Sequence, residues 1–253
     1  IPMLIPPLKN LRPIIKQDEH MKILSIFLGL MALTQAAFAE TRLGIYYQMT
    51  VSDPSAMVKA LDTFRSSSVG KKSSAVVTLS QIMANGTNPA THSLSVSYAS
   101  GADMDESRAA TRTSKEWAAL QSTMSQLMTP VSEQMYRTTE ISAGSSDAIT
   151  STNPVSRYIL MDVKDPANYV AAWNKMMGSR DSDLPSGIFQ VMSAGTAGIS
   201  HGVSITANNM AEKMALMDAN QGNPNWAEFL ASVEGIRTVE DDSMVVRIKS
   251  WGS

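Results

Sequence analysis

The chain has 253 residues, with 21 lysines and arginines against 23 aspartates and glutamates, and a formal net charge of −2 at pH 7. Such a balance excludes the strongly basic surface that nucleic acids and anionic lipids attract, so we expect no nucleic-acid partner. The chain contains no cysteine, which excludes disulfides and thiolate metal sites.

The first 39 residues have the features of a leader. Residues 1–20 contain several prolines and no periodic pattern, so we interpret them as a non-native upstream extension. A methionine and a lysine then precede an apolar run over 23–33, and the AFA sequence at 37–39 matches the small-x-small pattern of signal peptidase. The run is shorter than the roughly 20 residues that cross a bilayer. We predict a cleavable signal peptide over 21–39, a periplasmic or secreted protein, and no membrane span after cleavage.

Residues 40–142 are predicted to form four strands and two helices. Asp53-Pro54 is typical of a helix start, with Asp as N-cap and Pro in the first turn. Asn85-Gly86 is typical of a tight turn between two strands. Alternation and helical spacing then predict, in chain order, a strand over 45–51, a helix from 54, strands over 74–83 and 91–99, a helical segment over 103–128 with a break near 111–113, and a strand over 131–141.

Residues 143–156 are small and polar, as is typical of a linker. Residues 157–253 then repeat the same order of elements. The predicted elements are strand 158–163, helix 166–177, strands 188–193 and 200–207, helical segments 209–219 and 225–232, and strand 242–250.

The two halves also match in sequence. Residues 81–96 align without a gap on residues 190–205, where random pairing would give about one identity. The identical pairs are Gln81/Gln190, Met83/Met192, Gly86/Gly195, Thr87/Thr196, His92/His201 and Ser95/Ser204. We therefore predict that the part after residue 39 is one unit duplicated in tandem.

The order strand-helix-strand-strand-helix-strand is that of a ferredoxin-like unit, whose helices cover one sheet face and leave the other bare. Two such units can bury their bare faces against each other. We predict an α+β fold of two tandem ferredoxin-like βαββαβ units packed as an intramolecular pseudo-dimeric α+β barrel. This arrangement resembles the dimeric α+β barrel superfamily, which includes antibiotic-biosynthesis-type monooxygenases, EthD-like proteins and chlorite dismutases.

The third strand of each half alternates apolar residues with small polar ones. The small polar positions are Ser93, Ser95 and Ser97 in the first half and Gly202, Ser204 and Thr206 in the second. These faces either enclose a ligand cleft between two sheets or lie open to solvent on one sheet. We place a candidate small-molecule site at the paired positions near them: His92, His201, Gln81, Gln190, Thr87, Thr196, Ser95 and Ser204.

His92 and His201 have two interpretations. They could bind a ligand or metal or transfer a proton, or they could satisfy backbone groups of the hairpin loops. The second is favoured, because no carboxylate or second histidine lies at metal-ligand spacing. Gly198-x-Ser200-x-Gly202 matches the nucleophile elbow of hydrolases, but a strand follows where that motif needs a helix. We assign no catalytic residue and no metal ligand, and the cofactor and oligomeric state stay open.

Methionine is frequent, with 18 residues. The helical and strand spacing of these residues predicts core positions, including Met83, Met192 and Met214, and does not favour a copper site. The leading hypothesis is an exported protein that binds a small ligand in a cleft between the two units. The resemblance implies an alternative, a barrel-superfamily oxidoreductase that is either a cofactor-independent monooxygenase or haem-dependent, with His92 or His201 as base or axial ligand. A third hypothesis, a structural or interaction module, predicts no internal cavity.

Overall fold

A computed structural model describes residues 41–252, and the predictions for residues 1–39 lie outside this range. The elements of the first half are β1 (Leu43–Val51), α2 (Pro54–Ser66), β2 (Val76–Ala84), β3 (His92–Tyr98), α3 (Gly101–Thr111), α4 (Lys115–Leu127) and β4 (Met128–Ala143). Those of the second half are β5 (Val155–Val163), α5 (Pro166–Gly178), β6 (Ser186–Ser193), β7 (His201–Ala207), α6 (Met210–Gln221), α7 (Pro224–Val233) and β8 (Arg237–Trp251). Short 3-10 helices cover Gly70–Lys72 and Ser146–Ala148.

Capping residues start the helices where the sequence predicts. The Asp53 carboxylate accepts a hydrogen bond from the backbone N–H of Ala56 at the start of α2, and Asp165 does the same at the start of α5. The predicted break between α3 and α4 is present, because Ser114 caps a new helix by accepting from the backbone N–H of Trp117. Local sequence therefore determines these helix boundaries.

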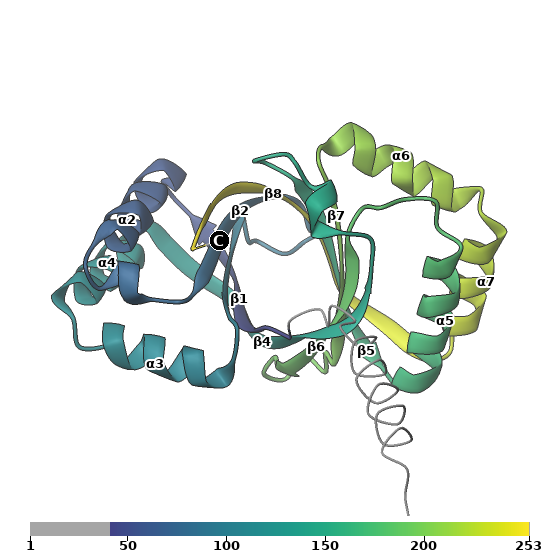
Figure 1. Ribbon diagram of the computed structural model, residues 1–253, viewed down its shortest axis with the longest axis horizontal. Coiled ribbons are helices and arrows are strands. Elements are labelled where there is room, and N and C mark those ends of the chain that lie inside the picture. Colours follow the sequence, from purple (N-terminus) through teal and green to yellow (C-terminus); the bar gives the residue numbers. More distant parts are fainter. Residues whose placement is uncertain (1–40, 253) are drawn as a thin grey trace, which may run out of the picture. The chain divides into compact units, whose positions relative to one another are not determined.

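The eight strands form one closed antiparallel barrel in the order β1-β3-β2-β8-β5-β7-β6-β4 (Figure 1). The first half contributes the run β4-β1-β3-β2, and the second half contributes β8-β5-β7-β6. Two seams join the halves, one between β2 and β8 and one between β4 and β6. β4 and β8 are longer than the sequence predicts, and each pairs along its length with a strand of its own half and a strand of the other half.

Helices cover the outer face of the barrel, with α2, α3 and α4 on one half and α5, α6 and α7 on the other (Figure 1). Under α2 and α4, Met57, Phe64 and Met124 pack with Met49 and Leu79 of the sheet. Aromatic residues dominate the second core, whose buried members are Met161, Val163, Tyr169, Trp173, Met176, Ile188, Val203, Phe229 and Val233. The described residues thus form a mixed α+β fold of one eight-stranded antiparallel sheet and six α-helices.

The core prediction for the methionines is correct at Met49 and Met161, which are almost fully buried, and wrong at three positions. Met83, Met192 and Met214 expose 53%, 46% and 44% of their surface. Met83 and Met192 lie at the ends of β2 and β6, next to turns, where the helix layer no longer covers the sheet. Among the described residues, no helix has the length and hydropathy of a bilayer-spanning segment.

Candidate ligand site inside the barrel

Alternation along each strand sends every second side chain into the barrel. On β1, Ile45, Tyr47 and Met49 pack under the helices, so Tyr46 and Gln48 point inward. Tyr158 of β5 also points inward, and its ring centroid lies 5.5 Å from that of Tyr46. The two halves therefore present their tyrosines to each other across the interior.

The interior contains a cavity of about 170 Å³. Its lining residues are Tyr46, Ser95, Gln134, Tyr136, Thr138, Tyr158, Leu160, Phe189 and Ser204. These come from six strands, and none comes from β2 or β8. On that side Ile82, Ala90 and Val245 form a small apolar cluster that fills the space. The cavity therefore lies off-centre, toward the seam between β4 and β6.

Two glycines make room for the aromatic wall of this cavity. A Cβ atom on Gly44 would lie 2.5 Å from Cζ of Tyr136, and one on Gly202 would lie 2.1 Å from Cζ of Phe189. Each ring thus lies against a bare backbone on the neighbouring strand, since Gly44 pairs with Tyr136 and Gly202 with Phe189. The two rings meet edge to face across the seam, with centroids 5.8 Å apart.

A buried polar network connects the two halves beside the cavity. Gln48, only 2% exposed, donates from Nε2 to Oδ2 of Asp241 at 3.1 Å. Its Oε1 accepts hydrogen bonds from Nδ2 of Asn88 and from Oγ of Ser132, each at 2.9 Å. Asn88 belongs to the turn between β2 and β3, so this turn folds over the barrel interior. The network joins β1, β4 and β8 through one amide.

Other polar groups at the cavity lack partners. The Tyr46 hydroxyl is buried and makes no hydrogen bond of normal geometry within residues 41–252, although Ser93, Gln48 and Ser243 lie close enough to lower its pKa. The side chains of Gln134 and Ser204 make none there either, whereas Ser95 and the hydroxyl of Tyr136 pair at 2.9 Å. A buried group without a partner costs about 1–3 kcal/mol. Such groups in a folded protein point to a water molecule or a ligand.

The three inward tyrosines are held in the neutral form. Burial raises the pKa of Tyr46, Tyr136 and Tyr158 above the ordinary value of a phenol. For Tyr46, the nearby polar side chains of Ser93, Gln48 and Ser243 act in the opposite direction and do not offset burial. These phenols therefore donate and accept hydrogen bonds without carrying charge.

The structure separates the eight residues of the predicted site. Ser95 and Ser204 line the cavity. His92, His201, Gln81 and Gln190 do not, because their side chains point to the outer face of the barrel. His92 pairs with Met49 and Gln81, and His201 pairs with Met161 and Gln190, so each set shares the face of a buried methionine of the helix-covered core. Thr87 and Thr196 are exposed in the turns after β2 and β6.

Each histidine contacts a neighbouring hydroxyl that is hydrogen-bonded to the end of an adjacent strand. The Thr91 hydroxyl accepts from the backbone N–H of Val51 at 3.0 Å and lies 2.9 Å from Nδ1 of His92. In the second half, Ser200 accepts from the backbone N–H of Val163 and contacts Nδ1 of His201, both at 2.9 Å. Burial lowers the pKa of both imidazoles. In both halves the hydroxyl, and not the imidazole, accepts from the backbone N–H, and each imidazole contacts that hydroxyl; Ser200 is engaged in this contact as well.

Most of the cavity wall is absent from the sequence-based site. Tyr46, Gln134, Tyr136 and Phe189 of the wall, and Gln48 beside it, were missed because the predicted site was limited to pairs within the matching segments 81–96 and 190–205. One signal was available in the first strands of the two halves, because Tyr46 precedes Met49 by three residues and Tyr158 precedes Met161 by three residues. Applying strand parity to this pair would have identified the facing tyrosines.

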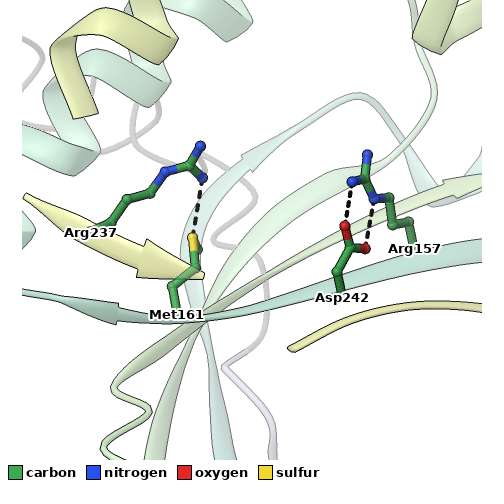
Figure 2. Close-up of polar contacts among 4 residues, drawn as sticks. All are labelled: Arg157, Met161, Arg237 and Asp242. Atoms are coloured by element: carbon green, nitrogen blue, oxygen red, sulfur yellow. Dashed lines mark hydrogen bonds and ion pairs between the residues drawn. The ribbon is translucent and has the colours of Figure 1, made fainter. Parts of the chain in front are cut away.

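Neither interior space fits a haem. The barrel cavity of about 170 Å³ is smaller than the roughly 300–1,000 Å³ of sites for drug-sized molecules. A second, apolar pocket under α5 and α7 holds only about 30 Å³. Arg237 is one of its lining residues, donating to Sδ of Met161 at 3.3 Å (Figure 2) and lying 5.5 Å from the ring centroid of Phe229. The described residues also contain no group of three or more His, Asp or Glu side chains that could hold a metal.

Polar contacts on the outer face of the barrel bind strands to one another. Figure 2 shows Arg157 of β5 paired through two hydrogen bonds with the Asp242 carboxylate of β8, one of them 2.8 Å from Nε to Oδ1. Both side chains are partly exposed, so the pair contributes little to stability. The pair links β5 to β8.

No protein-family model matches the chain, and no curated protein matches it in sequence. Solved structures do share its fold. A proposed monooxygenase from Fusobacterium nucleatum aligns with a TM-score of 0.56 and 8% identity over 84% of this chain and 94% of that one. An anthrone oxidase-like protein aligns with a TM-score of 0.54 and 11% identity over 85% and 94%. A mutant chlorite dismutase from Candidatus Nitrospira defluvii aligns with a TM-score of 0.50 and 8% identity over 81% and 90%. The chain therefore has the fold of the dimeric α+β barrel superfamily, and this confirms the resemblance seen in its sequence.

Proposed function

We propose that the protein binds a small molecule in the barrel cavity. The observation that carries this proposal is the buried Tyr46 hydroxyl, which has no partner among the described residues and belongs to a side chain lining a cavity of about 170 Å³. The unpaired polar side chains of Gln134 and Ser204 line the same space. A concave, mostly apolar space with a few convergent polar groups is the usual form of a ligand site.

We also propose that the two halves arose by tandem duplication of a ferredoxin-like unit. Corresponding strand pairs support this, since Met49 lies opposite His92 and Met161 opposite His201. Gly86 and Gly195, in the corresponding turns, have φ of 63° and 62°. Duplication explains why the cavity has a tyrosine and a serine from each half.

The alternative functions have less support. The similar structures include proteins named as a monooxygenase and a chlorite dismutase, but identities of 8–11% show the fold alone. An oxidoreductase using His92 or His201 as base or axial ligand would need an imidazole at the cavity, and both imidazoles lie on the outer face of the barrel. A purely structural module has no use for an internal cavity with unpaired polar groups.

Phenol is a suitable probe for the binding proposal. We expect added phenol to shift the amide NMR signals of residues around Ser95 and Ser204 in a saturable way. Ser204→Leu should abolish these shifts by filling the cavity, and Ser95→Leu tests the same point from the other half. His201→Gln changes a side chain on the outer face of the barrel and is the matched control; this variant should bind phenol with unchanged affinity. Saturable binding that survives both leucine variants would contradict the proposal, as would no binding at all.

We further propose that the protein is exported, on the sequence pattern of residues 21–39. N-terminal sequencing of protein from the periplasm or medium of expressing bacteria is expected to begin at Glu40. Recovery of the protein only in the cytoplasm, with residues 21–39 still attached, would contradict export.

A further inference from the structure

We infer that the ligand of the barrel cavity is an uncharged molecule of one aromatic ring with a hydrogen-bonding oxygen, an inference that rests on the binding function proposed above. Size sets the first limit. The cavity holds about 170 Å³, and an apolar cavity of about 150 Å³ holds benzene. Sites for drug-sized molecules are larger, at about 300–1,000 Å³. One ring with one or two small substituents fills the space.

The walls favour an aromatic ring over a saturated one. Tyr46 and Tyr158 form one wall, with their ring planes inclined by 46°. Tyr136 and Phe189 form another, edge to face, with ring planes at 65°. A planar ring between them can present its edge to one pair and its face to the other, which are the preferred aromatic geometries. Leu160 supplies the aliphatic contact.

The oxygen of the ligand corresponds to the unpaired polar groups. The hydroxyls of Tyr46 and Ser204 and the amide of Gln134 can each donate and accept a hydrogen bond. A hydrocarbon ring would leave all of them unpaired in the dry complex, which is unfavourable. A phenol, an aromatic aldehyde or an aromatic alcohol provides the missing partner.

Charge sets the last limit. None of the nine lining side chains is ionised at neutral pH, since tyrosine is the only titratable type among them and burial raises the pKa of all three tyrosines further above neutrality. An ionised ligand would lose its hydration without gaining a counter-charge at the cavity wall. The cavity therefore discriminates against the anion of an acidic ligand.

Three charged side chains approach the cavity from outside its lining. Arg42 donates from Nε to Oγ of Ser97 at 3.4 Å, and Asp241 accepts from Gln48. Arg247 of β8 is close enough to Tyr158 to lower its pKa, although burial outweighs this effect. A ligand whose carboxylate pairs with Arg247 is therefore the competing occupant, and benzoate is the probe for it.

The test uses 4-nitrophenol, which ionises near neutral pH and becomes yellow when it does. Adding the protein at a pH slightly above the pKa of the free phenol is expected to reduce the yellow absorbance, because the colourless neutral form binds. The apparent affinity should then fall about tenfold for each pH unit above that pKa. Binding of the yellow anion with undiminished affinity would overturn the inference.

Matched ligands and variants separate the remaining points. Phenol should bind about two- to tenfold more tightly than cyclohexanol and much more tightly than benzoate. Tyr46→Phe should weaken phenol binding about fivefold, whereas Tyr47→Phe, the adjacent tyrosine under the helices, should not. Tighter binding of benzoate, lost in Arg247→Gln, would overturn the inference while leaving the binding function intact. If neither phenol nor benzoate binds, the proposed function itself fails.

Discussion

Replacing Lys213 with methionine is expected to stabilise the protein at neutral pH and to flatten its stability between about pH 7 and 10. Lys213 lies on α6, is 1% exposed, and donates from Nζ to the backbone carbonyl of Ile205 at 2.9 Å. Burial, reinforced by Arg157 and Arg180 and opposed by Asp242, lowers its pKa to about 7. The corresponding residue of the first half, four positions after the helix N-cap, is the buried Met104.

The direction of the pH effect follows from proton linkage. The unfolded chain binds a proton at Lys213 below a pKa of about 10.4, whereas the folded chain does so only below about 7. Between these values the unfolded state holds more protons, so the free energy of unfolding falls as the pH falls, by up to about 1.4 kcal/mol per unit. Below pH 7 the loss is complete and amounts to several kcal/mol.

Urea unfolding of the wild type and Lys213→Met at pH 6 to 10 measures this effect. The difference in the free energy of unfolding should be largest at pH 6–7 and shrink toward pH 10. Lys175→Met is the control, because Lys175 is exposed on α5 and pairs only with the exposed Glu228. Parallel stability curves for the wild type and Lys213→Met would show that Lys213 is charged in the folded protein.

Gly202→Ala is expected to destabilise the protein by about 1–3 kcal/mol and to disturb the cavity. The added Cβ would lie 2.1 Å from Cζ of Phe189, so this ring must move. Phe189 cannot move freely, because it packs against Tyr136 across the seam between β4 and β6. The substitution therefore strains the aromatic wall, and phenol binding should weaken with it.

Gly187→Ala is the matched control for this prediction. Gly187 lies on β6, beside β7, and a Cβ there would be 3.6 Å from the carbonyl oxygen of Ile141, an ordinary contact. It is expected to leave stability nearly unchanged. Thermal unfolding of both variants, with phenol titration followed by NMR, makes the comparison. Equal stability of the two variants would mean that the packing of the Phe189 ring does not require the absence of a side chain at Gly202.

Local patterns predicted the elements and their order because each depends on neighbours in sequence. Asp53-Pro54 and Asp165-Pro166 start helices, and Asn85-Gly86 turns the chain, whatever the tertiary contacts. The internal match further predicted that the two halves share one order of strands. These signals were sufficient for the fold class.

The interior could not be predicted as fully, because it depends on pairs distant in sequence. Gln48 and Asp241 meet across the barrel, from β1 and β8, and nothing near either residue indicates the other. The off-centre cavity depends on a difference between the halves: Ile82 and Val245 fill one seam, while Tyr136 and Phe189 leave space at the other. Similarity between the two halves predicts what they share, whereas the off-centre position of the cavity depends on how they differ.

Closure of the sheet has a consequence for folding. A half folded alone would expose β2 and β4, or β6 and β8, as open edges whose backbone N–H and C=O groups can recruit strands of other molecules. Each half supplies the edge protection of the other through the two seams. A folding intermediate with only one half formed is therefore the species most prone to aggregation. Because both halves belong to one chain, the edges that protect each other are always at high local concentration.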